Sequence, residues 1–71
     1  MTIVESTNHP EIVFKHARSY IGASRIYRDK IKLSKGKDSI YIEGDNEVLL
    51  TEFALLVRGM RHSVYMMKEL D

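Results

Sequence analysis

The side chains that most often perform covalent or metal chemistry are sparse in this sequence. There is no cysteine, which excludes thiol nucleophiles and cysteine zinc sites, and no serine lies in the G-x-S-x-G pattern of hydrolases. The four glycines are scattered and form no phosphate-binding loop. His9, His16 and His62 lack a second histidine or aspartate at the i+4 spacing of a helical metal site. We therefore expect no catalytic residue, no metal site, no cofactor and no enzymatic activity.

Cations form the clearest functional pattern. Residues 14–37 hold eight basic side chains and one acid, although the formal net charge of the whole chain is only +1. A basic segment of this kind favours an anionic partner, because a row of cations can contact phosphates or an acidic protein surface. Tyr27 and Tyr41 could add stacking surfaces beside it. The candidate nucleic-acid or anion-binding residues are Arg25, Arg28, Lys30, Lys32, Lys35 and Lys37.

Two functions are compatible with this pattern. The first is a small non-enzymatic binding or regulatory protein that contacts nucleic acid through a basic β-hairpin. The alternative is a protein-interaction module or inhibitor, of the size that phages and mobile elements encode. It would dock its hairpin on an acidic protein surface, or its methionine-bearing helix into a groove. A continuous positive face would favour nucleic acid, whereas a basic patch interleaved with Glu43, Asp45 or Glu47 would favour a protein.

The elements that position these residues begin with a helix. The segment Asn8-His9-Pro10-Glu11, in which a turn-forming residue precedes a proline followed by an acid, is typical of a helix start. The spacing of the apolar residues predicts a helix over Pro10–Ile21, with Gly22 at its end. The alternative is a strand over Glu11–Tyr20, since alternate residues there would share one face. Residues 1–9 are left open between a strand and a flexible arm.

Alternation of apolar and polar residues predicts a hairpin next. Residues 27–33 place Tyr27, Ile31 and Leu33 on one face, and residues 39–43 repeat the pattern. A glycine between them, Gly36, is expected to supply the positive φ of a tight turn. With a two-residue loop at positions 35 and 36, Ile31 would face Ile40.

A long amphipathic helix is predicted over Glu47–Leu70, after an Asp45-Asn46 pair that can cap it. Its apolar arc widens to roughly 200°, which is more than a two-stranded sheet can cover. Gly59 lies inside this helix, where glycine costs roughly 1 kcal/mol against alanine, and close approach of another helix would explain it. We therefore expect a homo-oligomer, most simply a homodimer. Its candidate interface consists of Leu55, Gly59, Met66 and Leu70.

These elements predict an α+β fold in the order helix, hairpin, long helix. The alternative is a three-stranded antiparallel sheet plus one helix, should residues 11–20 be extended. The chain has 71 residues, of which 44% are hydrophobic, enough for one small domain over 1–71. No stretch approaches the roughly 18 apolar residues of a membrane span, and the first ten residues do not resemble a secretory signal. We expect a cytoplasmic protein with no membrane partner.

Overall fold

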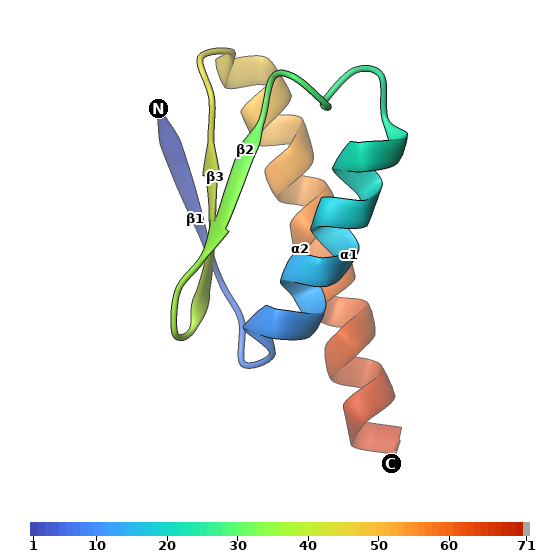
Figure 1. Ribbon diagram of the computed structural model, residues 1–71. Coiled ribbons are helices and arrows are strands. Elements are labelled where there is room, and N and C mark those ends of the chain that lie inside the picture. Colours follow the sequence, from blue (N-terminus) through green and yellow to red (C-terminus); the bar gives the residue numbers. More distant parts are fainter. Residues whose placement is uncertain (71) are drawn as a thin grey trace.

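The protein folds as a three-stranded antiparallel sheet covered on one face by two helices (Figure 1). The computed structural model describes residues 1–70, and the side chains of residues 1–67. Both helices lie on the same side of the sheet and run antiparallel to each other (Figure 1). The predicted α+β class, the first helix, the hairpin and the long helix are confirmed. The elements in chain order are β1 (Thr2–Ser6), α1 (Pro10–Ala23), β2 (Lys32–Lys35), β3 (Ser39–Glu43) and α2 (Glu47–Leu70).

The first strand resolves the open question about the N-terminal residues. β1 pairs along its whole length with β3, which makes β3 the central strand in the order β1-β3-β2. The sheet therefore has three strands, as the alternative fold predicted, but the strand added to the hairpin consists of residues 2–6 and not of residues 11–20. The alternative strand over Glu11–Tyr20 is wrong, because this segment is helical. Val13 and Ala17 are fully buried one helical turn apart, and they anchor α1 on the sheet.

The register of the hairpin differs from the predicted one. Leu33 pairs with Ile42, and Lys35 pairs with Ile40, so Ile31 does not face Ile40. The turn is closed by the Gly36 amide, which donates to the Ser39 carbonyl at 2.8 Å. Gly36 has no positive φ. Glycine is favoured there by space, because a β-carbon would lie 2.8 Å from the Tyr41 ring.

Residues 24–31 correct the predicted strand over 27–33. The Ser24 hydroxyl accepts the amides of Ile26 and Tyr27, and the Ile31 amide donates to the Tyr27 carbonyl at 3.1 Å. The segment is therefore a set of turns. Tyr27 and Ile31 are both buried, although they do not lie on a strand. A spacing of four residues places two side chains on the same side of a helical turn as well as of a strand, so the pattern fits both structures. Helix α1 also continues through Gly22 and ends at Ala23.

Helix α2 begins as its capping residues predict. The Leu49 amide donates to the Asn46 side-chain oxygen at 3.2 Å, and Glu47 lies in the first turn, where the helix dipole favours an acid. Phe53 and Leu50 are fully buried against the sheet and α1. Together α1 and α2 enclose one core between the helices and the inner face of the sheet. Its largest fully buried side chains are Phe53, Ile40, Ile42, Leu50, Val13 and Val57.

Candidate functional site

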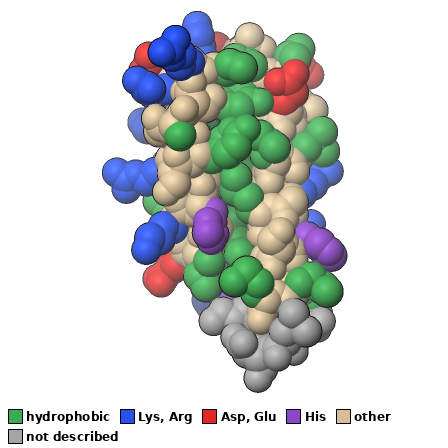
Figure 2. Space-filling model, turned by 90° about the vertical axis from the view of Figure 1, so that its right-hand side faces the viewer, with side chains coloured by type: hydrophobic (Ala, Val, Ile, Leu, Met, Phe, Trp, Pro, Cys, Tyr) green, Lys and Arg blue, Asp and Glu red, His purple; other side chains and the backbone are tan. Residues whose placement is uncertain are grey.

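An open apolar groove runs between α1 and α2 on the face of the molecule that points away from the sheet. Figure 2 shows it as a continuous band of hydrophobic side chains between the two helices, with Lys and Arg on both flanks and more of them on the left. Its volume is about 720 Å³. No carboxylate lines it, so it is suited to apolar rather than cationic groups. The lining residues are His16, Ser19, Tyr20, Leu56, Gly59, Met60, Ser63, Val64 and Met67.

Aromatic packing forms the wall at the upper end of the groove. Tyr20 lies with its ring centroid 6.2 Å from that of Phe53, and Tyr27 lies 5.3 Å from the same phenylalanine. Tyr27 and Phe53 are buried, whereas Tyr20 keeps 42% of its surface exposed. Because the buried rings hold Tyr20 from behind, its exposed part is a fixed surface at the groove rather than a free side chain.

Of the predicted oligomer residues, Gly59 lines this groove, and Leu55 and Met66 are exposed on α2. Leu55 is 59% exposed and Met66 is 45% exposed. A β-carbon at Gly59 would meet no atom within 4 Å, so no intramolecular contact explains that glycine. The side chain of Leu70 lies outside the described residues. Self-association through these residues stays a prediction.

The six predicted anion-binding cations do not share one face. Arg25, Arg28 and Lys30 lie in the turns before β2. Lys32 and Lys35 lie on β2 but three residues apart, so their side chains leave opposite faces of the sheet. Lys37 lies in the hairpin loop. The hairpin therefore does not present these cations as a single row.

Acidic residues are interleaved with the basic ones. Lys32 is the cross-strand partner of Glu43. Lys30 lines a polar depression of about 530 Å³ together with Asp45 and Glu47. The Lys35 amine lies 3.7 Å from a carboxylate oxygen of Glu11. These acids reduce the positive potential that a phosphate backbone would meet along the hairpin.

The two tyrosines proposed as stacking surfaces differ in accessibility. Tyr41 is 38% exposed on the open face of the sheet, where a base could reach it. Tyr27 is only 7% exposed, so the expectation that it offers a stacking surface is wrong. Its hydroxyl donates to a carboxylate oxygen of Glu52 at 3.4 Å. Burial first, and then the Glu52 charge, raise the pKa of Tyr27 above its ordinary value.

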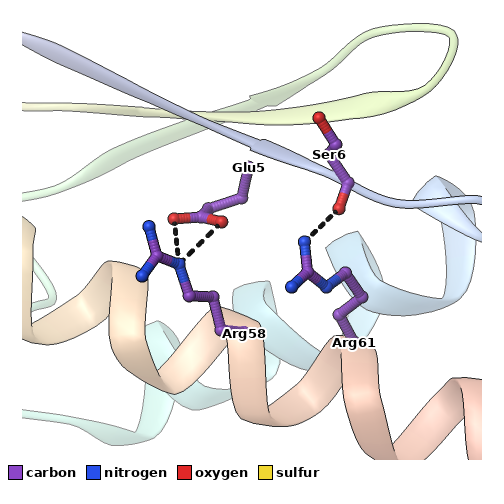
Figure 3. Close-up of polar contacts among 4 residues, drawn as sticks. All are labelled: Glu5, Ser6, Arg58 and Arg61. Carbon is purple, nitrogen blue, oxygen red and sulfur yellow. Dashed lines mark hydrogen bonds and ion pairs between the residues drawn. The ribbon is translucent and has the colours of Figure 1, made fainter.

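A polar pair that sequence reasoning missed links the sheet to α2 (Figure 3). Glu5 is buried on the inner face of β1, and Nε of Arg58 donates to both of its carboxylate oxygens, at 2.9 and 3.1 Å. One turn further along α2, Nη1 of Arg61 donates to the Ser6 carbonyl at 2.9 Å. The sequence signal that could have revealed this pair is Glu5 itself, an acid that shares a face with the apolar Ile3 in a short alternating stretch. Its partner lies 53 residues away in the chain.

The described side chains contain no group of three histidines or carboxylates that could hold a metal ion. Within the described residues, neither helix has a stretch long and apolar enough to span a bilayer. Comparison with known proteins found no matching family model, no matching curated protein and no matching solved structure.

Proposed function

We propose that the protein is a non-enzymatic protein-interaction module that binds an apolar helix of a partner in the groove between α1 and α2. The observation that carries this proposal is the groove itself: about 720 Å³, open along the helices and lined by no carboxylate. A groove between two antiparallel helices matches the shape of a third helix, which can insert side chains spaced at i, i+3, i+4 and i+7.

The exposed side chains around the groove support the same function. Leu55, Met66 and Met67 are between 45% and 66% exposed on α2, and Ile12 is 36% exposed on α1. An apolar surface that extends beyond the groove is typical of a protein interface. Methionines suit this role because their flexible side chains adapt to a partner's shape.

The charge distribution supports a protein partner over nucleic acid. The pairing of Lys32 with Glu43, and the position of Lys30 beside Asp45 and Glu47, match the arrangement expected for a protein-binding surface. Contact with nucleic acid through the hairpin stays a prediction.

The experiment is a titration with a synthetic amphipathic helical peptide, followed by NMR of the side-chain methyl groups. We expect saturable shifts at Leu56, Met60 and Val64, and none at Val4 on the open sheet face. Ser63→Gln places a larger polar group in the groove and should weaken binding, whereas the matched Ser34→Gln on the sheet should not. Shifts spread equally over both faces, or no shifts, would refute the proposal.

A further inference from the structure

The rim of the groove on the α1 side is cationic. Lys15 and Arg18 are both exposed. Lys15 lies with Glu11, Ile12, His16 and Ser19 around a small depression that adjoins the groove. His16 and Ser19 also line the groove itself. Arg18 lies around a second depression with Lys15, Ser19 and the Glu11–Lys35 ion pair. Figure 2 shows cations along the left flank of the apolar band.

These two cations are not neutralised within the fold. Among the described side chains, no carboxylate lies within ion-pair distance of Lys15 or Arg18. The nearest acid on the same helix, Glu11, is engaged with Lys35. Glu52 on α2 accepts the Tyr27 hydroxyl and is not among the residues that line the groove. The α1 rim therefore offers two cations without an ion-pair partner beside an apolar surface, and the one acid near them is already paired with Lys35.

We infer that the partner is an acidic amphipathic helix, whose apolar stripe fills the groove and whose flanking carboxylates face Lys15 and Arg18. This inference rests on the proposed function and adds the charge of the partner. Opposite charges at a rim select between partners and speed their association, while the apolar seam supplies most of the affinity.

A second copy of this chain satisfies the rim less well. No residue that lines its own groove is acidic, and the acid beside its α1 rim, Glu11, is already paired with Lys35. A copy packed groove to groove would therefore bring Lys15 and Arg18 no unpaired carboxylate from these surfaces. It would also add two further cations to the assembly. A helix from another protein with acidic flanks would supply an apolar stripe for the groove and carboxylates for Lys15 and Arg18.

The test uses three synthetic helical peptides with the same leucine stripe and with Glu, Gln or Lys at the flanking positions. At low salt the Glu peptide should bind about threefold to tenfold more tightly than the Gln peptide, and the Lys peptide should bind most weakly. The preference should shrink as salt is added, because the rim charges are exposed.

A matched pair of double variants assigns the preference to the rim. Lys15→Glu with Arg18→Glu should abolish or reverse it. Lys32→Glu with Lys37→Glu makes the same change in net charge on the hairpin and should retain it. Circular dichroism of both variants establishes that they are folded. Loss of the preference in both variants, or in neither, would overturn the inference.

The remaining outcomes separate this inference from the proposed function. Equal binding of all three peptides would overturn the acidic partner while leaving the groove as a binding site. If no peptide binds, both the groove as a helix-binding site and the acidic partner are overturned. The same holds if the protein binds phosphatidylserine vesicles but none of the peptides. Sedimentation equilibrium, run alongside, detects self-association, and a dimer that competes with the Glu peptide for the groove would also overturn the acidic partner.

Discussion

Glu5 and Arg58 form an ion pair in which the buried carboxylate belongs to β1 and the guanidinium reaches it from α2 (Figure 3). The two members are unequally shielded, because the Glu5 side chain is 5% exposed and the Arg58 side chain is 57% exposed. The carboxylate has therefore lost its water, and Arg58 replaces the lost hydrogen bonds. The pair ties the edge strand β1 to α2.

Removing Arg58 should destabilise the fold by leaving this carboxylate without its partner. We expect Arg58→Met to lower the free energy of unfolding by about 1–2 kcal/mol, less than for a fully buried pair, because water can reach the vacated side. In a Glu5→Leu background, Arg58→Met should lower the free energy of unfolding much less, because no buried carboxylate is left unpaired. Urea unfolding of the four proteins gives the coupling energy. Equal costs in both backgrounds would show that the pair contributes nothing.

The glycines at 59 and 44 should respond oppositely to alanine. At Gly59 a β-carbon meets nothing within 4 Å, so Gly59→Ala should stabilise the helix by up to about 1 kcal/mol. At Gly44 a β-carbon would lie 2.6 Å from the Lys30 carbonyl oxygen, so Gly44→Ala must displace backbone and should destabilise. Thermal melts compare the two. A loss of stability in Gly59→Ala would indicate a packing role for this glycine.

Alkaline pH should weaken the fold through Tyr27. Burial and the Glu52 charge raise its pKa in the folded protein above the ordinary value of 10.0. The folded state therefore holds this proton more tightly than the unfolded state does. This contribution is fully present below the unfolded pKa and is lost as pH rises through the folded pKa.

The measurement is urea unfolding at a series of pH values across and above about 10. The slope of stability against pH should be shallower in Tyr27→Phe than in the unmodified protein. Tyr41→Phe is the control, because this tyrosine is exposed on the open sheet face. Identical profiles for the unmodified protein and Tyr27→Phe would contradict the prediction.

Nucleic-acid binding through the hairpin has a distinct salt signature. If the cations contact phosphates, the logarithm of affinity for duplex DNA should fall with the logarithm of salt at a slope near −0.9 per contact. Changing Lys30, Lys32 and Lys35 together to Gln should make that slope shallower by up to about three units. Titration of labelled DNA and RNA checks this. The protein-binding proposal expects no such binding at physiological salt.

The residue pattern was sufficient to predict the two helices. Val13 and Ala17 keep helical spacing after a proline start, and α2 combines an Asn46 cap with a long periodic stripe. These signals are local, because caps and periodicity act within a few residues. The exposed positions of Leu55 and Met66 could also be read from the width of the apolar arc.

Tertiary structure decided the sheet and the groove. The Tyr27 and Ile31 spacing fits a strand or a helical turn equally, and only the Ser24 hydrogen bonds and the core resolve it as turns. A register depends on pairing between separate segments, so the match of Leu33 with Ile42 was not predictable from alternation alone.

Glu5 illustrates the physical limit of the sequence. An acid at an inward position argues against a buried strand unless a cation compensates it, and Arg58 lies 53 residues away. The groove is likewise built from residues 16–20 of α1 and 56–67 of α2, which become neighbours only when both helices pack on one face of the sheet. Local chemistry determined the two helices. Long-range packing decided which of their surfaces are buried and which are left to bind.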